Sequence, residues 1–338
     1  MKAILLSRFG GPDILKFVEK PDPLPATGEV RVKIEAIGLN YAEILSRKGQ
    51  YPWAPRTPYI LGMEGYGKID MLGEGVKNRK IGQKVITGAM SGMYAEYVTV
   101  PVEQTIPPVP DFTPEENAAF GVNYLTAWAA LFEDARVRKG DVVLVHAAAG
   151  GVGTAAVQLL VHAGCHVIGC VGSDEKRQMV KKLGAELVVN YNERGWENQI
   201  REKYTNGVNV ILNLVSGKVY RKSRELLAPL GKIVVVGLAG LEYKLINPVS
   251  IYRALLDLPR ADIRQMFVRS YGISALHIGY LLPYSSVVDR LRKRLSSFVQ
   301  KYKIRPVIGK VFYFDQMCEA HWFMESRANT GKIVVKIP

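Results

Sequence analysis

A short run of small residues, Ala147–Gly153, carries the clearest chemical signal in the sequence. It contains three glycines in the spacing Ala148-x-Gly150-x-x-Gly153, with Gly151 between them. Glycine lets a backbone turn tightly and approach a phosphate, and the free N–H groups at the start of a helix attract negative charge. The pattern therefore predicts a dinucleotide pyrophosphate site, with alanine in place of the first glycine of the usual fingerprint.

The segments around this loop have the strand–helix–strand order that such a site needs. Val142–Val145 and His166–Val171 predict buried strands, and Thr154–His162 between them has the composition of a helix. Residues 142–173 contain no Lys, Arg, Asp or Glu, so a membrane span is the alternative. The glycines in the turn, the histidines and the strand-like ends argue against a span, since buried parallel strands are also continuously apolar.

Strands and helices alternate throughout the region after residue 140. The predicted strands are 142–146, 166–171, 187–190, 208–214 and 232–236, and the predicted helices are 154–163, 174–183, 195–203 and 218–228. This alternation predicts an α/β fold with a doubly wound parallel sheet. Residues 241–272 then form a basic, helix-like insertion interrupted at Pro259.

The two ends of the chain have a different pattern. Residues 1–118 predict a β-rich domain, with strands at Glu29–Ala36 and Ala95–Val100 and frequent Pro and Gly. Thr113 and Glu116 form a capping box that starts a helix, and a further helix is predicted at about 122–132. Residues 332–337 predict a strand that returns to the first domain. One face of an amphipathic helix is marked by Val287, Val288, Leu291, Leu295, Phe298 and Tyr302.

Composition sets the outer limits on function. A chain of 338 residues with 48% hydrophobic and 22% charged residues predicts two globular domains. Three cysteines, without a CxxC pair, predict neither a disulfide framework nor a cysteine metal site, and favour a reducing cytoplasm. The net charge of +14 is spread along the chain, which favours a solvated basic surface over a nucleic-acid or membrane site.

Taken together, these parts resemble the medium-chain dehydrogenase/reductase superfamily, and within it the zinc-free quinone oxidoreductase (zeta-crystallin-like) family. The resemblance covers nearly the whole chain. It rests on AIGLNYAEILSRKGQYP at 36–52, LGMEGYGKI at 61–69, NYLTAW at 123–128, VLVHAAAGGVGTAAVQL at 143–159 and NTGKIVV at 329–335. The insertion, taken as far as residue 280, is similar to that of synaptic vesicle membrane protein relatives.

The resemblance implies a Rossmann NADP-binding domain, residues 119–275, inserted in a GroES-like catalytic domain made of residues 1–118 and 276–338. The active site would lie in the cleft. Zinc-dependent members of the superfamily need a cysteine where this chain has Asn40 and a histidine where it has Met63, and no second cysteine stands near Val122. An amide and a thioether do not replace thiolate, imidazole or carboxylate as zinc ligands, so no metal site is expected.

Without a metal, hydride transfer suits acceptors that are already electrophilic, such as quinones and α,β-unsaturated carbonyls. Hydride addition to these acceptors gives an oxyanion, which hydrogen-bond donors can stabilise. By resemblance Asn40 and Tyr51 line the cleft, Asn40 donating to the acceptor oxygen and Tyr51 contacting the nicotinamide end. Alternatively, Asn40 only satisfies backbone at a strand end and Tyr51 packs as a turn aromatic. Glu64 is expected to orient the loop without transferring a proton. The histidines His146, His162, His166 and His277 are interpreted as fold residues.

The choice of cofactor depends on the residues at the end of the second strand. Asp174 is the candidate for an NAD ribose contact, but Ser173 is a good N-cap, which makes Asp174 a first-turn residue suited to the helix dipole. By resemblance Lys176 and Tyr191 meet the 2′-phosphate of NADP, so NADPH is the predicted cofactor. The alternative is that Lys176 is a solvated charge on the helix surface without a role in cofactor binding. Further implied cofactor contacts, each of which can also be read as a turn residue, are Tyr51, Thr126, Ala149, Gly150, Gly151, Val152, Gly153, Gly172, Ser173, Gly217, Val236, Gly237, Leu238, Ser274, Ala275 and Asn329.

The prediction that results is a cytoplasmic NADPH-dependent reductase of a quinone or enone, and the family implies a homodimer joined at sheet edges. The alternative is an NADPH-binding interaction protein with little turnover that contacts membranes or RNA. That alternative rests on the insertion and the positive charge, although the apolar residues of the insertion can equally form a lid over the acceptor.

Overall fold

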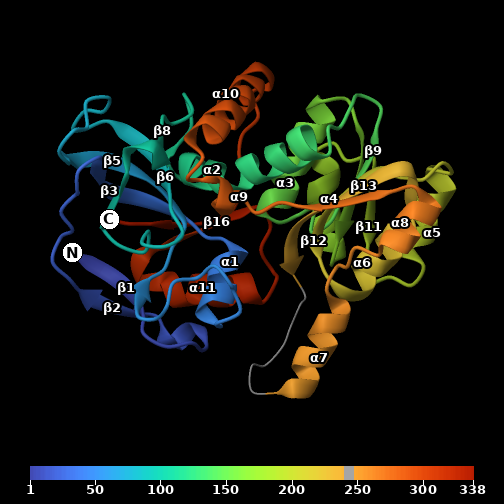
Figure 1. Ribbon diagram of the computed structural model, residues 1–338, viewed down its shortest axis with the longest axis horizontal. Helices are drawn as coiled ribbons and strands as arrows, with labels where there is room; N and C mark the ends of the chain where they lie inside the picture. The colour runs from blue at the N-terminus through green and yellow to red at the C-terminus, as the bar shows by residue number, and fades with distance from the viewer. Residues whose placement is uncertain (240–246) are drawn as a thin grey trace. The chain divides into compact units, whose positions relative to one another are not determined.

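The computed structural model describes residues 1–239 and 247–338, and residues 240–246, at the start of the predicted insertion, lie outside the described part (Figure 1). The chain divides into two compact units. Unit 1 comprises residues 1–125, 279–297 and 305–338, and unit 2 comprises residues 126–278 and 298–304. The boundaries predicted from the sequence are at residues 118 and 275.

Unit 1 is built mainly of antiparallel strands. Its strands are β1 (Lys2–Leu6), β2 (Lys16–Glu19), β3 (Glu29–Gly38), β4 (Tyr59–Ile60), β5 (Glu64–Leu72), β6 (Lys84–Gly88), β7 (Tyr97–Pro101), β8 (Thr105–Ile106), β15 (Ile308–Tyr313) and β16 (Lys332–Lys336). The larger sheet has the order β15-β16-β3-β5-β6-β8, with β7 also paired to β3, and the smaller has the order β2-β1-β4.

The long strand β3 lies at the centre of unit 1. Its residues alternate between the core and the outside over most of its length, as the period-two pattern of EVRVKIEA predicts. It pairs with β5 along its length and with the C-terminal strand β16 at Gly38 and Ile37. The predicted return of residues 332–337 to the first domain is thereby confirmed, and it places the C-terminal strand beside the segment that carries Asn40.

Helices complete unit 1. They are α1 (Tyr41–Arg47) and α11 (Met317–Glu325), while α2 (Pro114–Trp128), α9 (Ile278–Leu281) and α10 (Ser285–Tyr302) cross the boundaries between the units. The predicted capping box at the start of α2 is confirmed, because Glu116 N–H donates to Thr113 Oγ1 at 3.2 Å and Thr113 N–H donates to Glu116 Oε2 at 2.8 Å. The predicted apolar face of α10 is also confirmed, since Val288, Leu291 and Leu295 are buried.

Unit 2 contains a six-stranded parallel sheet, which confirms the predicted doubly wound fold. Its strands are β9 (Val142–Val145), β10 (His166–Val171), β11 (Leu187–Asn190), β12 (Val208–Val215), β13 (Leu227–Ala239) and β14 (Gly272–Ala275). The order is β11-β10-β9-β12-β13-β14, so the direction of winding reverses at β9. Ligands of such sheets bind at this switch point, outside the carboxyl ends of the strands.

The helices of unit 2 follow the predicted alternation closely (Figure 1). They are α3 (Gly151–His162), α4 (Asp174–Lys182), α5 (Trp196–Lys203), α6 (Gly217–Arg224), α7 (Pro248–Asp257) and α8 (Ile263–Arg269). Residues 247–272, the described part of the insertion, contain the helices α7 and α8 and are broken near Pro259, as predicted. Among the helices described, none has both the length and the apolar content that crossing a bilayer requires. Residues 142–173, considered as a span, contain β9, α3 and β10.

Three predicted elements have different bounds in the structure. The helix expected at 122–132 is part of α2, which begins at Pro114 and runs into a π-helical turn, Ala129–Asp134. The helix expected at 218–228 ends at Arg224, and the strand expected at 232–236 runs from Leu227 to Ala239. Long-range parallel pairing of β13 with both β12 and β14 extends this strand beyond its apolar run.

Candidate active site

The predicted pyrophosphate loop connects β9 to α3. Gly150 is the N-cap of α3 in an extended conformation, and Gly151 and Val152 are half-exposed at the start of the helix. A Cβ at Gly153 would lie 2.2 Å from the Ala147 carbonyl oxygen, so only glycine allows the helix to pack this tightly on the loop. The first amides of a helix have no intrahelical acceptor, and in this chain they follow a turn without large side chains.

The parallel sheet brings most of the predicted nucleotide contacts to one edge. Gly172 follows β10, Tyr191 follows β11 and Gly217 follows β12, and the carboxyl ends of parallel strands meet at the same side of a sheet. Gly172 and Tyr191 are direct neighbours, since a Cβ at residue 172 would lie 2.5 Å from the Tyr191 hydroxyl oxygen. Ser173 is the N-cap of α4, and Lys176 is half-buried in its first turns.

Asp174, the candidate for an NAD ribose contact at this edge, pairs with an arginine of its own helix. The Asp174 carboxylate is mostly exposed and pairs with Arg177 on the same helix at 3.3 Å, and Arg177 also pairs with Glu193 at 2.7 Å. A hydrogen bond from Ser173 lowers the pKa of the exposed Glu175 carboxyl. Ser173 occupies the N-cap position, as expected, but its side chain makes no capping hydrogen bond to the helix backbone. Asp174 and Glu175 lie in the first turn of α4, where the helix dipole favours negative charge, as expected.

The other predicted contacts occupy varied positions. Val236, Gly237 and Leu238 were expected to end the fifth strand, and they lie within β13 near its carboxyl end, just before Ala239. Ser274 and Ala275 end β14, as predicted, but the Ser274 hydroxyl donates to Asp134 Oδ2 at 2.5 Å. Thr126 is buried, and its hydroxyl has no hydrogen-bond partner within the described residues. Ala149 is buried within the loop, and Asn329 is half-buried before β16.

In unit 1, Asn40 is the N-cap of α1 and is 8% exposed. Its Nδ2 donates to the Gly38 carbonyl oxygen at 3.1 Å and to Glu64 Oε1 at 3.0 Å. Its Oδ1 accepts from Lys332 Nζ at 2.7 Å. Both amide hydrogens are therefore used inside unit 1, which is closer to the alternative in which Asn40 satisfies backbone at a strand end.

A buried ion pair stands next to this amide. Lys332 Nζ donates to Glu64 Oε1 as well as to Asn40, and the two ionic side chains are only 3% and 1% exposed. Glu64 Oε2 accepts the backbone N–H of Val122 at 2.7 Å. The expectation that Glu64 orients the loop agrees with these contacts. Lys332 was missed from the sequence, where it appears only as the polar first residue of an apolar strand.

A second buried carboxylate, Glu43, ties the same region together. It accepts from the backbone N–H groups of Asn40 at 3.0 Å and Met63 at 2.8 Å, and from the Tyr94 hydroxyl at 2.7 Å. Burial raises the pKa of Glu43, and these hydrogen bonds oppose the rise. The carboxylate therefore joins the end of β3 to the start of β5.

The hydrogen-bond chain continues to the C-terminal part of unit 1. Because the Tyr94 hydroxyl donates to Glu43, it accepts from His321 Nε2, 2.9 Å away. Burial lowers the pKa of His321 to about 3, with a smaller contribution from Arg47. His321 is thus neutral with its proton on Nε2. No sequence signal indicated this residue, since 227 positions separate it from Tyr94.

Tyr51 lies in the turn after α1 and is half-buried. Its ring contacts Trp53 edge to face, with 5.4 Å between ring centroids. Burial raises the pKa of Tyr51 to about 12, and the charge of Glu43 contributes to the rise. A hydroxyl with this pKa stays protonated at neutral pH, so Tyr51 can act as a hydrogen-bond donor. Asn40 and Tyr51 therefore flank the same short helix.

The histidine nearest to the nucleotide loop has a structural environment. His146 is fully buried between Asn213 Oδ1 at 2.9 Å and Ser223 Oγ at 2.7 Å. Burial lowers the pKa of His146 to about 4, although the bond to Asn213 opposes the fall. With the side chain buried and both nitrogens engaged, the interpretation of His146 as a fold residue is supported.

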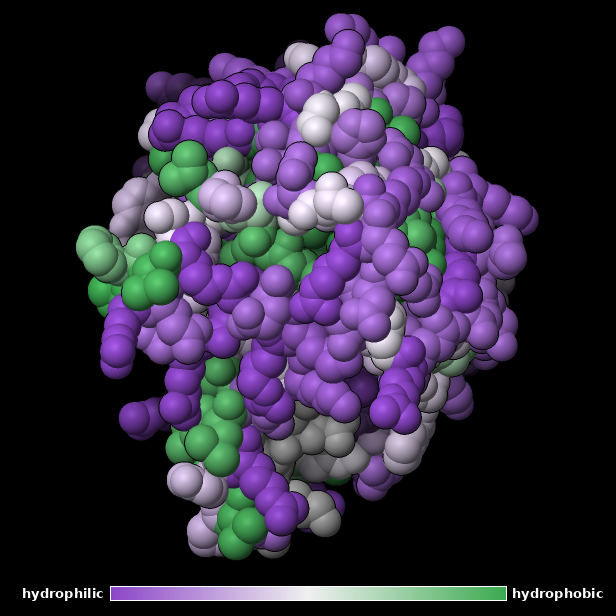
Figure 2. Space-filling model, turned by 90° about the vertical axis from the view of Figure 1, so that its right-hand side faces the viewer, coloured by the Kyte–Doolittle hydropathy of each residue, from purple (hydrophilic) through white to green (hydrophobic). Residues whose placement is uncertain are grey.

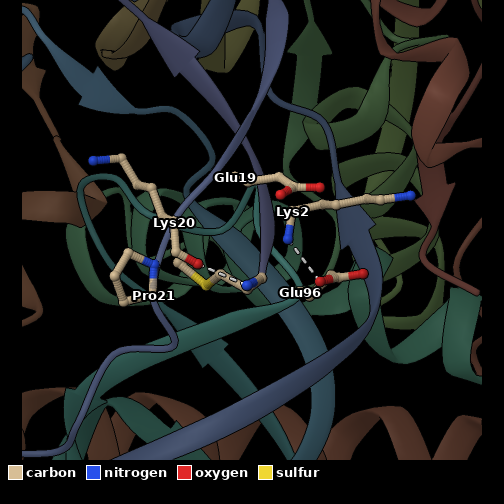
Figure 3. A pocket seen from close by; sticks show the side chains of 6 residues that line it. Lys2, Glu19, Lys20, Pro21 and Glu96 are labelled. Carbon is tan, nitrogen blue, oxygen red and sulfur yellow. Dashed lines mark hydrogen bonds between the residues drawn. The ribbon is translucent and has the colours of Figure 1, made fainter.

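A polar depression elsewhere on unit 1 has no role in this site. Figure 3 shows its lining residues, which are Met1, Lys2, Glu19, Lys20, Pro21 and Glu96. The Lys2 backbone N–H donates to Glu96 Oε2 at 2.7 Å (Figure 3). None of the predicted site residues lines this depression.

The donor set around Asn40 does not suit zinc. The side chains at the three positions noted in the sequence are an amide, a thioether and an isopropyl group. Across residues 1–239 and 247–338, no three His, Cys, Asp or Glu side chains gather in a way that would hold a metal ion.

Two protein-family models match the chain, and together they define its class. The alcohol dehydrogenase GroES-like domain matches residues 26–111, within unit 1. The zinc-binding dehydrogenase model matches residues 151–273, within unit 2. The chain therefore combines the two domains of an alcohol-dehydrogenase-like oxidoreductase.

Similar proteins narrow this class. The chain is 33% identical to the synaptic vesicle membrane protein VAT-1 homolog of Rattus norvegicus, over 99% of this chain and 84% of the relative. It is also 33% identical to the quinone oxidoreductase of Rattus norvegicus, over 99% of this chain and 97% of the relative. The structure of Escherichia coli quinone oxidoreductase complexed with NADPH superposes with a TM-score of 0.88 and 26% identity, covering 99% of this chain and all of that one.

The chain belongs to the medium-chain dehydrogenase/reductase superfamily and, within it, to the quinone oxidoreductase family that is similar to the VAT-1 homologues. The family and the fold predicted from the sequence are thereby confirmed.

Proposed function

We propose that this protein is an NADPH-dependent reductase that transfers hydride to a quinone or an α,β-unsaturated carbonyl without using zinc. The observation that carries the proposal is the nucleotide edge of unit 2. There the glycine loop, the start of α3 and the Gly172–Tyr191 pair follow neighbouring strands of one parallel sheet. The NADPH complex of the Escherichia coli relative supports the choice of cofactor.

The residues at this edge fit such a nucleotide. The amides of Gly151, Val152 and Gly153 would bind the pyrophosphate. Gly153 lets α3 pack closely on the loop, so that the pyrophosphate can approach the backbone. Lys176 and Tyr191 would bind the 2′-phosphate, while Asp174 is engaged by Arg177. NADPH, when bound, supplies the hydride. The other residues implied by the resemblance remain predicted contacts.

The acceptor class follows from the donors in unit 1. Asn40, Met63 and Val122 do not supply zinc ligands, so the site has no Lewis acid with which to polarise a simple alcohol or ketone. Quinones and conjugated carbonyls spread the added charge onto oxygen, where a neutral donor such as the Tyr51 hydroxyl can stabilise it. The proposed reaction therefore needs only hydrogen bonds from the protein.

The first test is the oxidation of NADPH in the presence of benzoquinone, phenanthrenequinone or a simple enone, with NADH in parallel and with a chelator in a matched sample. Turnover with NADPH that the chelator leaves unchanged supports the class, the cofactor and the independence from metal. Tight NADPH binding without reduction of any acceptor would overturn the reductase proposal.

A homodimer is part of this proposal, with a second copy bound at the edge of unit 2. Strand β14 is the last strand of its sheet, and a hollow beside it is lined mainly by apolar residues, including Met266, Phe267 and Tyr271. The neighbouring Leu230 and Phe267 are 88% and 87% exposed. Figure 2 views this side of the molecule and shows apolar side chains among hydrophilic ones. Phe267→Asp should convert dimer to monomer in sedimentation analysis, and a wild-type monomer would contradict the proposal.

The helix α7 supports the second candidate, an interaction protein that contacts membranes or RNA. Val249, Tyr252 and Leu256 share one face of α7 and are each at least half exposed, and Arg253 lies among them. An exposed apolar face beside a basic residue suits an anionic membrane surface. Co-sedimentation with anionic vesicles or RNA at increasing salt tests this candidate, because an electrostatic contact weakens steeply with salt. No salt-sensitive binding would remove it.

A further inference from the structure

Three chain segments in unit 1 are joined through two buried carboxylates. Glu43 accepts the backbone N–H groups of Asn40 and Met63, and Glu64 accepts that of Val122. These are the positions at which zinc-dependent relatives would carry ligands. Here the end of β3, the start of β5 and the middle of α2 are held by hydrogen bonds to anions instead of by a metal.

The Lys332 ammonium connects the carboxylate of Glu64 to the side chain of Asn40. We call Asn40, Glu64 and Lys332 the Lys332 cluster. Glu64 Oε1 accepts from both the lysine and the Asn40 amide, and Asn40 Oδ1 accepts from the lysine at 2.7 Å. Asn123 Oδ1 lies 3.5 Å from the ammonium and is also buried. An uncompensated charge at this depth would be costly, so the three members depend on one another.

The cluster also determines which way the Asn40 amide points. Its nitrogen faces two acceptors, the Gly38 carbonyl and Glu64, and its oxygen faces the ammonium. A flipped amide would place its oxygen against two acceptors and its nitrogen against a cation. With both hydrogens already donated, this amide has none left for an acceptor molecule.

Two glycines leave space for the cluster. A Cβ at Gly38 would lie 2.8 Å from Lys332 Cε, and a Cβ at Gly121 would lie 3.0 Å from Glu64 Oε2. Neither glycine has a positive φ. The Ala118 carbonyl oxygen, 2.2 Å from a Cβ at residue 38, also requires glycine there, and the Lys332 and Glu64 side chains pack closely against both glycines.

We propose that Lys332 is a positioning residue of the reductase. Lys332 holds the Asn40 segment and α1 in place, and thereby positions Tyr51, at the other end of α1, to contact the acceptor. Asn40 serves the same purpose and does not donate to the acceptor oxygen. This inference rests on the proposed function for its effect on turnover, but the structural role of the cluster does not depend on it.

Lys336 offers a matched control. It lies on the same strand as Lys332 and also pairs with a glutamate, Glu115, at 2.8 Å, but its side chain is 43% exposed. Because exposed pairs contribute little, Lys336→Met should change neither structure nor turnover. Lys332→Met has the same change in chemistry at the buried position.

The test measures hydrogen exchange of the Asn40, Met63 and Val122 amides by mass spectrometry, together with kcat for a quinone and the Kd of NADPH. For Lys332→Met we expect exchange at Val122 and Asn40 to rise about tenfold or more, and kcat to fall by about tenfold or more. The NADPH Kd should stay within about twofold, because the proposed contacts to the pyrophosphate and the 2′-phosphate, which supply most of the binding, lie in unit 2. Lys332→Arg should recover part of both losses because it keeps the cation.

Asn40→Ala serves as a second variant if Lys332→Met does not fold, since it leaves the Lys332–Glu64 pair in place. We expect it to speed exchange at Val122 and to lower kcat together. Exchange in Lys332→Met that matches Lys336→Met would overturn the proposal, and so would an Asn40→Ala protein with lower kcat but unchanged exchange, which would identify Asn40 as a direct donor. If the wild-type protein reduces no quinone, the proposed function fails, while the exchange measurements still decide the role of the cluster.

Discussion

Gly38 and Lys332 lie so close together that a Cβ at residue 38 would stand 2.8 Å from Lys332 Cε. On its other side the same Cβ would stand 2.2 Å from the Ala118 carbonyl oxygen. The lysine side chain could move, but the backbone of α2 cannot move without disturbing the Glu64 contact to Val122. The buried ion pair and the glycine are therefore two parts of one packing arrangement.

Gly38→Ala should destabilise unit 1 by about 1–3 kcal/mol, because overpacking forces backbone shifts in a tightly filled site. Urea unfolding monitored by tryptophan fluorescence measures the change. Gly88→Ala in β6 is the control, since its Cβ would make only an ordinary contact at 3.4 Å to the Met63 carbonyl oxygen. Equal stability of the two variants would show that the space between residue 38, Ala118 and Lys332 is not constrained.

Much of the fold could be predicted from local patterns. The strands and helices of unit 2 follow directly from apolar runs and caps, because parallel strands are buried on both faces and helices separate them. Errors arose where a distant partner decides the outcome. β13 is longer than its apolar run because β12 and β14 both pair with it. The helix begun by the capping box and the helix expected at 122–132 form one continuous helix, α2.

The candidate site could be predicted only in part. The glycine loop is visible because all its residues are adjacent in the sequence. The Lys332 cluster is not visible, since Lys332 is 292 positions from Asn40, and a single lysine at the start of KIVVKI resembles an ordinary strand end. The family resemblance pointed to Asn40 and Tyr51, but it did not show that both amide hydrogens of Asn40 are already used.

Two glycines of the nucleotide loop should differ in how strongly substitution by alanine weakens NADPH binding. Gly153→Ala should weaken NADPH binding by about tenfold or more and lower stability, since its Cβ would meet the Ala147 carbonyl oxygen at 2.2 Å. Gly150→Ala should have the smaller effect, because its nearest contact is 3.3 Å to the same oxygen. Fluorescence titration with NADPH compares the two variants, and a larger loss for Gly150→Ala would contradict the packing argument.

Lys176 should determine the preference for NADPH over NADH. We expect Lys176→Ala to reduce kcat/KM for NADPH by about tenfold, a loss of about 1.4 kcal/mol, and to leave NADH almost unaffected, since only NADPH carries the 2′-phosphate. Lys181→Ala, at the exposed end of the same helix, is the matched control. If Lys176→Ala changes neither nucleotide, Lys176 is a solvated helix charge, which is the alternative interpretation from the sequence.

The stability of unit 1 should fall in acid because of His321. Burial lowers the pKa of His321 from the ordinary 6.5 to about 3. Between these two pH values the histidine is protonated in the unfolded chain and neutral in the folded chain. Stability is then complete above pH 6.5 and is lost as the pH falls toward 3. For this one group we expect a loss of about 2 kcal/mol between pH 7 and pH 5.

His321→Gln keeps a donor for the Tyr94 hydroxyl but cannot take up the proton. The difference in unfolding free energy between pH 7 and pH 5 should therefore be smaller in His321→Gln than in the wild-type protein by about 2 kcal/mol. This comparison cancels the titration of Glu43, whose raised pKa gives stability that is lost as the pH rises. His166→Gln is the control, because the His166 side chain is 48% exposed and pairs with Glu186 at the surface. If the unfolding free energy depends on pH in the same way in His321→Gln and wild type, His321 takes up a proton in the folded state. The hydrogen bond between Tyr94 and His321 would then not be shielded from solvent.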